Sequence, residues 1–356
     1  MRVLLAEHRA DGHRLDYVRI LDDHLTASGH DVVLLLGPDV PSAPHFAAYL
    51  GDLDPARITV APAGGAWLDA LAATSRTLEV DGVAVPDGDH TLLQLGLRGR
   101  WDGRGRITGL VLRDPVRYAS RSAAGRLRAA GKRVLLGRAA RIPDVVALRL
   151  AGQVMPSGPG WVRDPVSFDP CPGGEAELRS RLGLDADLFW FGVFGRVQAR
   201  KNLGLTADAM ARLGPGTGLL VAGICDADAL DEAAPAIDRL RAAGTVVRIE
   251  NRLLPARELD GLVRLVDCLV IAHSNEGPSG LLGKALAAGS RVVAAGARSL
   301  RPEAALSPAG VWSPLTPARL GAALERARSL PRPAPVPVAD AASFADAFAA
   351  ALRDAR

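Results

Sequence analysis

Residues 270–295 read V-I-A-H-S-N-E-G-P-S-G-L-L-G-K-A-L-A-A-G-S-R-V-V-A-A, and this stretch indicates the fold class of the chain. Its apolar, partly β-branched start is typical of a strand that is buried on both faces. The small and polar residues 273–280 predict a turn, and residues 281–288 predict a helix that ends at Gly289. A second apolar run over 292–295 predicts another strand. The stretch is therefore a strand–turn–helix–strand unit of an α/β protein with a parallel sheet.

The turn in this stretch has the features of a binding loop. It directs free backbone N–H groups and the positive end of a helix towards the edge of the sheet, which is a natural place for an anion such as phosphate. Every strand–loop–helix connection shares that geometry, so a purely structural connection is the alternative. Glu276, followed by Pro278, Ser279 and Gly280, favours a loop that holds a polar ligand.

The segment E-G-P-S-G-L-L-G-K-A-L-A-A-G-S-R-V-V-A resembles the signature of the retaining GT-B glycosyltransferases of family four. That signature is a Glu, seven residues, a second Glu, then Ala-x-Ala-x-Gly and a strand. The resemblance implies a GT-B fold, an α/β architecture of two Rossmann-like parallel-sheet domains that face a central cleft. It also implies that Glu276 contacts hydroxyl groups of the donor sugar. The second position, which holds the nucleotide ribose in the family, is Lys284 here.

A second segment with a family resemblance follows the apolar run 188–194 and reads G-R-V-Q-A-R-K-N-L-G-L. In the family, a G-R-x-x-x-x-K pattern binds the donor diphosphate, and Arg196 and Lys201 match its two cations. Fixed cations stabilise the charge that develops on a diphosphate leaving group without a metal ion. Ser279 and Gly280 would add backbone N–H groups. The resemblance also implies that backbone near Asn251 holds the nucleobase.

Three interpretations of Lys284 remain open, because a Lys cannot accept hydrogen bonds from a ribose diol as a carboxylate does. The ribose is held elsewhere, Lys284 adds a third cation at the phosphates, or the donor site is degenerate. Lys occurs only at positions 132, 201 and 284 in this Arg-rich chain. Two of the three lysines thus fall within the predicted donor site.

The composition indicates a two-domain protein of the cytoplasm. A chain of 356 residues with 48% hydrophobic residues can form two cores. No apolar run approaches the roughly 20 residues that span a bilayer, and the N-terminus becomes polar too early for a signal peptide. The three cysteines are scattered, which favours a reducing compartment.

The resemblance implies an N-terminal Rossmann-like acceptor domain over 1–164, a C-terminal Rossmann-like donor domain over 165–335, and a C-terminal helix over 336–356 that packs back on the first domain. The strand–helix–strand pattern at the N-terminus predicts a parallel sheet for the first domain. The segment 158–174 resembles the crossover between the two domains of the family.

Candidate acceptor residues lie where strands of the first domain are expected to end. Gly12 and His13 are in the loop after the first strand, where open α/β sheets bind ligands. Asp87, Asp89 and His90 form an acidic turn after a later strand, and carboxylates beside a His suit acid–base chemistry or the fixing of sugar hydroxyls. A turn built from Asp and Gly for backbone reasons is the alternative. No residue cluster indicates a metal site or a cofactor, apart from a nucleoside-diphosphate sugar as donor co-substrate.

The segment 98–141 carries thirteen basic residues against two acidic ones, Asp102 and Asp114. Such a face attracts an anionic membrane surface or an acidic acceptor, although a solvated face is the alternative. Aromatic residues for base stacking are nearly absent from it, which argues against nucleic acid as a partner.

The sequence therefore predicts a retaining glycosyltransferase that moves a sugar from a nucleoside-diphosphate sugar to a saccharide, lipid-linked or natural-product acceptor. The alternatives are a GT-B-fold binding or scaffold protein with a degenerate donor site, and a sugar epimerase or hydrolase on the same fold. The expected location is the cytoplasm, with peripheral membrane contact through the basic segment.

Overall fold

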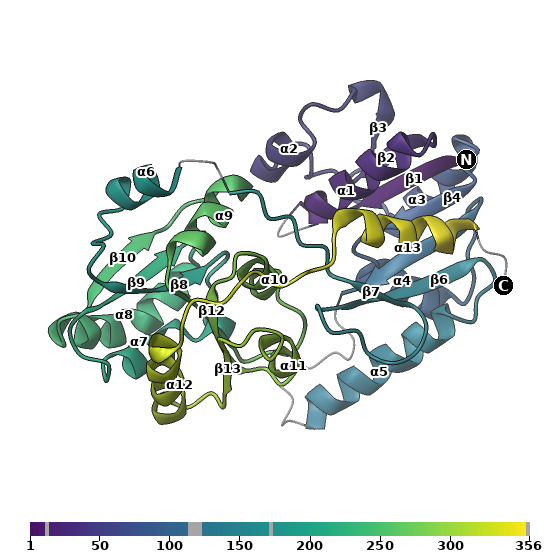
Figure 1. Ribbon diagram of the computed structural model, residues 1–356. Coiled ribbons are helices and arrows are strands. Elements are labelled where there is room, and N and C mark those ends of the chain that lie inside the picture. The colour runs from purple at the N-terminus through teal and green to yellow at the C-terminus, as the bar shows by residue number, and fades with distance from the viewer. Residues whose placement is uncertain (11–13, 113–122, 171–173, 354–356) are drawn as a thin grey trace. The chain divides into compact units, whose positions relative to one another are not determined.

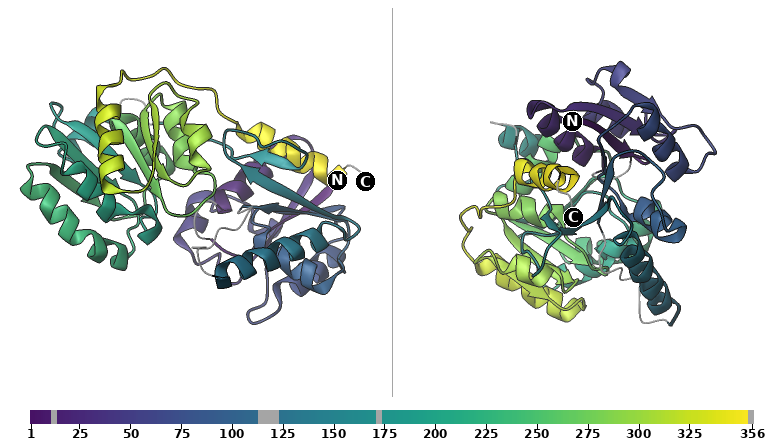
Figure 2. Two further views of the ribbon diagram at one scale, coloured as in Figure 1. Left: turned by 90° about the horizontal axis from the view of Figure 1, so that it is seen from below. Right: turned by 90° about the vertical axis from the view of Figure 1, so that its right-hand side faces the viewer.

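The computed structural model describes residues 1–10, 14–112, 123–170 and 174–353. The chain forms two compact units. Unit 1 contains Met1–Ala151, Met155–Arg163 and the C-terminal segment from Asp340, and unit 2 contains Gly152–Val154 and Asp164–Ala339. Each unit is a parallel sheet with helices on both faces (Figures 1 and 2).

The sheet of unit 1 has seven strands in the order β3-β2-β1-β4-β5-β6-β7, all paired in parallel. The strands are β1 (Arg2–Glu7), β2 (Asp31–Leu36), β3 (Ile58–Val60), β4 (Gly82–Val85), β5 (Arg106–Val111), β6 (Val145–Ala151) and β7 (Trp161–Arg163). The helices of this unit are α1 (Arg14–Ala27), α2 (Pro44–Tyr49), the 3-10 turn η1 (Pro55–Arg57), α3 (Trp67–Thr77), α4 (Asp89–Arg98), α5 (Ala123–Ala139) and α13 (Ala341–Arg353).

The sheet of unit 2 has six parallel strands in the order β10-β9-β8-β11-β12-β13. The strands are β8 (Phe189–Phe194), β9 (Thr217–Ala222), β10 (Val246–Glu250), β11 (Cys268–His273), β12 (Arg291–Gly296) and β13 (Gly310–Ser313). The helices are α6 (Gly174–Arg181), the 3-10 turn η2 (Ala199–Lys201), α7 (Leu203–Met210), α8 (Ala227–Ala242), α9 (Ala256–Leu265), α10 (Gly280–Ala287), α11 (Leu300–Ala304) and α12 (Pro317–Ser329).

In both sheets the order of the strands reverses next to the first strand of the unit. This reversal indicates where each sheet would bind a ligand. In unit 2 the order of the strands is 3-2-1-4-5-6 by position along the chain, which is the Rossmann order, and unit 1 adds a seventh strand to it. In such sheets ligands bind at the carboxyl ends of the strands, at the point where the order reverses. These points lie between β1 and β4 in unit 1 and between β8 and β11 in unit 2.

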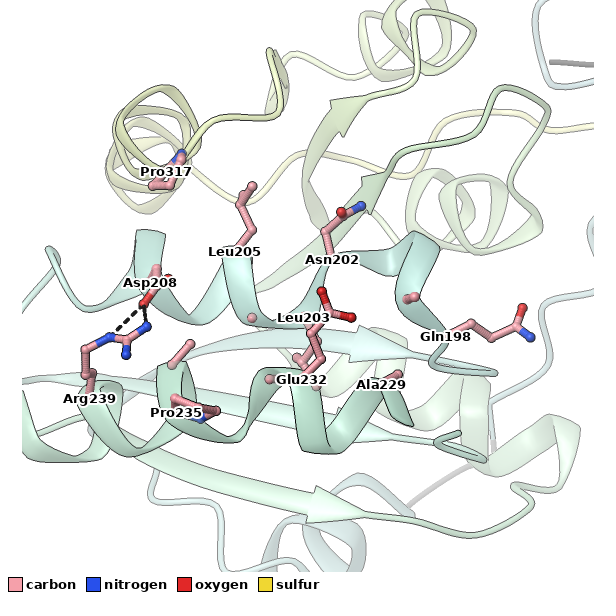
Figure 3. A pocket seen from close by; sticks show the side chains of 14 residues that line it. Gln198, Asn202, Leu203, Leu205, Asp208, Ala229, Glu232, Pro235, Arg239 and Pro317 are labelled. Carbon is pink, nitrogen blue, oxygen red and sulfur yellow. Dashed lines mark hydrogen bonds and ion pairs between the residues drawn. The ribbon is translucent and has the colours of Figure 1, made fainter. Parts of the chain in front are cut away.

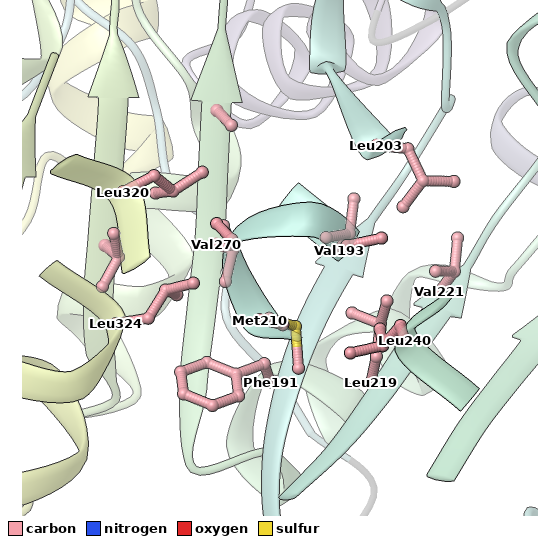
Figure 4. Packing of buried hydrophobic residues seen from close by; sticks show 14 of the residues in the cluster. Phe191, Val193, Leu203, Met210, Leu219, Val221, Leu240, Val270, Leu320 and Leu324 are labelled. Atoms are coloured by element: carbon pink, nitrogen blue, oxygen red, sulfur yellow. The ribbon is translucent and has the colours of Figure 1, made fainter. Parts of the chain in front are cut away.

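Each sheet is buried on both faces, which explains the continuous apolar runs of its strands. In unit 2, Phe191 and Val193 point to the face that is covered by α7, α8 and α12, as Figure 4 shows for the residues around Met210. Trp190 and Phe194 point to the opposite face, under α6, α9, α10 and α11. Burying each such side chain contributes about 1.5–3 kcal/mol, so these alternating residues hold the helices on the sheet.

The helix α13 belongs to the core of unit 1, although it is the last element of the chain. Its residues Phe344 and Phe348 are buried together with β-strand residues and with α1. The ring of Phe344 lies 5.0 Å from that of Tyr17 in α1. The other face of this sheet is covered by α3 and α4, through residues such as Leu71 and Leu95.

Candidate functional site

The site in unit 2 is built on the loop that leaves β8. Gly195 follows the strand with a φ of +78°, a conformation that an L side chain rarely adopts. A Cβ atom at this position would stand 3.3 Å from the Lys201 ammonium nitrogen. The loop then makes the 3-10 turn η2, whose last residue is Lys201, before α7 begins. The glycine thus allows the chain to turn back so that Lys201 lies against the end of its own strand.

Lys201 is a buried cation at this edge, with 6% of its surface exposed. Its ammonium donates a hydrogen bond to the carbonyl of Phe194. Burial, with a smaller effect of the neighbouring Arg200, lowers the pKa of Lys201 to about 7. At the end of β11, burial also lowers the pKa of His273 to about 3, so this imidazole is neutral at physiological pH. A bound anion would therefore stabilise the charged form of Lys201.

Arg200 joins the two loops of the site, and the sequence analysis did not single it out. Its guanidinium donates to the amide oxygen of Asn275 at 3.3 Å, and its carbonyl accepts from the N–H of Ser274 at 2.9 Å. Both partners belong to the loop that leads from β11 to Glu276. The signal in the sequence was the position of Arg200, next to a predicted phosphate-binding Lys.

The Arg196 side chain is bonded to Asp226 and not to groups at the end of β8. Its Nε donates to Asp226 at 3.1 Å, and Gln198 donates to the other oxygen of the same carboxylate at 3.1 Å. These two side-chain hydrogen bonds, that of Gln198 first, lower the pKa of Asp226. The Arg196 side chain is about half exposed. Reaching a diphosphate beside Lys201 would require Arg196 to leave Asp226.

Asn251 holds a loop in place. Its side-chain oxygen accepts the N–H of Cys225 at 2.9 Å, and the carbonyl of Glu250 accepts the N–H of Gly223 at 3.0 Å. The ends of β9 and β10 are thereby fixed to one another. The resemblance implied that the backbone at residues 250–252 holds a nucleobase, and these two hydrogen bonds fix the start of that segment.

Glu276 lies in the predicted loop between β11 and α10 and accepts two backbone hydrogen bonds. One oxygen accepts from the N–H of Arg298 at 3.1 Å, and the other accepts from the N–H of Ser299 at 2.8 Å. The Ser299 hydroxyl accepts the N–H of Gly277 and donates to the carbonyl of Gly277, both at 3.1 Å. The loop before α11 therefore holds the carboxylate in a fixed orientation.

The helix α10 begins beside Glu276, as predicted. Ser279 is its N-cap residue, is nearly buried, and makes no side-chain capping bond. The first N–H groups of a helix have no partner within the helix, so those of Ser279 and Gly280 suit an anion at this edge.

Lys284 points to the inner side of α10. Its ammonium donates to the carbonyl of Ser167 and to the carboxylate of Asp260, the latter at 2.5 Å. Asp260 is buried in α9, and its second oxygen accepts the N–H of Asp169. Lys284 thus ties α10 to α9 and to the segment that enters unit 2. The sequence could not show this pair, because Asp260 is 24 residues away.

The predicted acceptor residues of unit 1 lie at the edge where β1 and β4 end. Asp87 follows β4, is buried, and accepts a hydrogen bond from Arg14 at 2.5 Å. Asp89 and His90 form the first turn of α4, whereas the sequence indicated a turn without a helix. Asp89 is paired with Lys132 of α5 at 3.0 Å. Gly12 and His13 lie outside the described residues.

Glu7 and His8 belong to the same edge, and the sequence analysis missed them. The His8 ring stacks on that of His90 at 5.1 Å. Glu7 is buried, burial raises its pKa, and its Oε2 has no hydrogen-bond partner in the described part of the chain. The Nδ1 of His8 lies 3.6 Å from Oε1 of Glu7, and neither nitrogen of His8 is within hydrogen-bonding distance of a described partner. Polar residues directly after a buried first strand were the signal that could have revealed this pair.

A separate pocket of about 360 Å³ lies between α7 and α8 (Figure 3). One end is lined by Gln198 and Asn202, and the other by the ion pair of Asp208 with Arg239 at 2.7 Å. It is not lined by Lys201 or Glu276. Among the described residues, no group of three or more His, Cys, Asp or Glu side chains is arranged to hold a metal ion. Nor is any helix in the described ranges both long and apolar enough to cross a bilayer.

Solved structures share the architecture of the whole chain. HepE from Anabaena, solved with UDP and glucose, matches with a TM-score of 0.68 at 17% identity, over 98% of this chain and 95% of HepE. Sucrose-phosphate synthase from Thermosynechococcus elongatus matches with 0.68 at 17% identity, over 99% and 94% of the two chains. WaaG, a glycosyltransferase involved in lipopolysaccharide biosynthesis, matches with 0.63 at 14% identity, over 99% and 96%.

These neighbours are GT-B glycosyltransferases, so the predicted fold class, GT-B with two Rossmann-like parallel-sheet domains, is confirmed. No protein-family model and no curated protein sequence matches the chain.

Proposed function

We propose that this protein is a glycosyltransferase that uses a nucleoside-diphosphate sugar, with the donor site in unit 2. The observation that carries the proposal is the buried Lys201 at the reversal point of the sheet, beside the start of α10 and the fixed carboxylate of Glu276. Solved proteins of the same fold add support, since HepE was crystallised with UDP and with UDP-glucose.

The donor diphosphate would bind to Lys201, to the N–H groups of Ser279 and Gly280, and to Arg196 once it exchanges Asp226 for a phosphate. These groups stabilise the negative charge that grows on the leaving diphosphate. The transfer would then need no metal ion, in keeping with a donor set of cations and N–H groups. Asn251 would support the nucleobase through the backbone of its loop.

Glu276 would orient the donor sugar. A carboxylate offers about four acceptor positions, and backbone N–H groups occupy two of them here. A carboxylate held in this orientation suits the hydroxyl groups of a sugar, which donate hydrogen bonds to it. The resemblance of this loop to retaining enzymes leads us to propose that the transfer retains the anomeric configuration.

Lys284 would act within the framework of unit 2 rather than on the ribose, because Ser167 and Asp260 occupy its ammonium. The ribose would then be held by other groups of the donor site. This is the first of the three interpretations that the sequence left open.

The acceptor would bind to unit 1, against Asp87 and His90, and we add Glu7 and His8 to that site. Their unused hydrogen-bonding atoms suit an acceptor with hydroxyl groups. We further propose a location in the cytoplasm, consistent with Cys225 and Cys268, which are both free and buried.

A GT-B scaffold protein without turnover is the second candidate. The Arg196–Asp226 ion pair and the Lys284–Asp260 pair favour it, because both engage residues that were expected to serve the donor. A sugar epimerase or hydrolase would share the donor site but would need no acceptor.

The test is calorimetric titration with a panel of nucleoside diphosphates and their sugar conjugates. We expect one base series to bind, and Lys201→Ala and Arg196→Ala each to weaken binding by about tenfold or more. Arg239→Ala is the matched control, since Arg239 is an exposed arginine that is paired with an aspartate in the same unit. Glu276→Ala should abolish transfer more than it weakens binding of the nucleotide alone. Absence of binding across the panel would leave the scaffold hypothesis as the better one.

A further inference from the structure

The outer face of α5 combines unpaired positive charge with exposed apolar side chains. The helix contains four arginines and one lysine and no acidic residue. Lys132 is buried and paired with Asp89, so it belongs to the inner side. The four arginines have exposed positions, and none makes an ion pair with a carboxylate in the described ranges; they are Arg126, Arg128, Arg133 and Arg138.

In the basic segment 98–141, some of the described arginines have carboxylate partners and others do not. Arg98 is paired with Asp69 and Asp102, and Arg100 is also paired with Asp102. Arg104 is paired with Glu79. The charge of these three arginines is therefore largely compensated, whereas the four arginines of α5 make no ion pair with a carboxylate in the described ranges.

Exposed apolar residues gather at the same place. Among the large hydrophobic side chains of the described residues, the three most exposed are Leu127 at 75%, Leu97 at 67% and Val134 at 62%. Leu127 and Val134 are on α5, and Leu97 is in the last turn of α4, which packs against α5 (Figure 1). Scattered single hydrophobic residues need no explanation, but a concentration of the most exposed ones indicates an interaction surface.

The spacing along α5 places these groups on one face. Leu127 and Val134 are seven residues apart, which is about two helical turns, so they lie on one line, with the exposed Gly131 between them. Arg126 and Arg133 have the same spacing and form a parallel line next to it. An apolar line flanked by arginines is the pattern of a helix that lies in the interface of a membrane.

We propose that the α5 face, formed by Arg126, Leu127, Arg133 and Val134, docks unit 1 on an anionic lipid bilayer. The arginines would contact lipid phosphates, and the two apolar side chains would enter the boundary of the acyl chains. A nucleic acid would match the charge but would leave Leu127 and Val134 against phosphates, and α5 has no aromatic residue for base stacking. This proposal does not depend on glycosyl transfer.

Sedimentation with vesicles tests the proposal on the full chain. We expect binding to phosphatidylcholine vesicles that contain phosphatidylglycerol and no binding to phosphatidylcholine alone, with a loss of binding at high salt. The double variant Arg126→Ala/Arg133→Ala should bind about 25-fold more weakly. The variant Leu127→Ala/Val134→Ala should bind several-fold more weakly at unchanged charge. Alanine is the best helix former, so both variants keep the helix, as circular dichroism and the thermal midpoint would verify.

The matched control is Arg319→Ala/Arg326→Ala on α12, which removes two exposed arginines with the same seven-residue spacing from unit 2. Its vesicle binding should change by less than about twofold. The proposal is wrong if the wild-type chain does not sediment with anionic vesicles, or if the α12 control weakens binding as much as the α5 arginine variant. It is also wrong if the apolar variant binds vesicles like the wild type. Binding of duplex DNA without binding of vesicles would instead assign the face to nucleic acid.

Discussion

The ionisation of Lys201 should make nucleotide binding depend on pH. Its pKa of about 7 in the free protein means that half of the molecules carry a neutral amine at that pH. A diphosphate binds the ammonium form of Lys201, so binding raises the pKa of Lys201. At a pH above 7, binding is therefore accompanied by the uptake of a proton. The association constant should therefore fall by up to about tenfold for each pH unit above the pKa of the free protein.

Calorimetry in buffers of different ionisation enthalpy measures this proton uptake directly, with a nucleotide sugar as ligand. Lys201→Met is the control, because it removes the titrating group and fills a similar volume. We expect weak and pH-independent binding for this variant. The same slope in the variant and in the wild type would show that another group titrates.

At the scale of residues, the sequence predicted where candidate side chains lie on the fold better than it predicted their contacts. Glu276 and Lys201 were expected at the edge of the sheet because each follows a buried strand and belongs to a local pattern. The partners of Lys284 and Arg196 could not be found, since Asp260 and Asp226 are 24 and 30 residues away and only the fold brings them close. Glu7 was missed for a different reason, because a single carboxylate after a strand is a weak signal without the burial that the structure shows.

At the scale of elements, the glycines of α4 and α5 differ in what surrounds them. A Cβ at Gly131 of α5 would have no atom within 4 Å, whereas a Cβ at Gly96 of α4 would lie 2.2 Å from the carbonyl oxygen of Leu135. Gly131→Ala should therefore stabilise the protein by about 0.5–1 kcal/mol, because alanine restricts the unfolded chain and favours the helix. Gly96→Ala should destabilise it by about 1–3 kcal/mol, because α4 and α5 must move apart.

Urea unfolding of the two variants beside the wild type gives both changes in the free energy of unfolding. The two substitutions are chemically identical, so opposite signs would come from packing alone. A loss of stability for Gly131→Ala would mean that α5 is packed on its outer face in solution.

The same helices show why some elements escaped prediction. The strands β11 and β12 and the helix α10 were predicted within about two residues of their bounds, because the strands are continuous apolar runs and a glycine follows the helix. The helix α5 was not predicted, and its residues were described only as part of the basic segment 98–141. Its three glycines, its many arginines and its exposed Leu127 and Val134 obscure the helical period. The three-residue strand β7 fell inside the expected linker, where no propensity marks so short an element.

At the scale of the whole molecule, each unit has its own core, and the last helix of the chain completes the first unit. The family resemblance implied a C-terminal helix over 336–356 that packs back on the first domain. It could not show which side chains it meets. The structure buries Phe348 completely, 5.3 Å from the ring of Phe344.

Phe348→Ala should therefore destabilise unit 1 and leave unit 2 nearly unchanged. Removing a buried Phe costs about 3–5 kcal/mol, which corresponds to a shift of about 10 °C for a unit of this size. A bound nucleotide should raise the unfolding temperature of unit 2 and leave that of unit 1 unchanged, because a ligand stabilises the unit that holds it. Scanning calorimetry of the wild type and the variant, each with and without nucleotide, separates the two effects. If Phe348→Ala lowered the nucleotide-sensitive transition by the same amount, the two units would unfold as one cooperative body, and the helix that closes one core would support both.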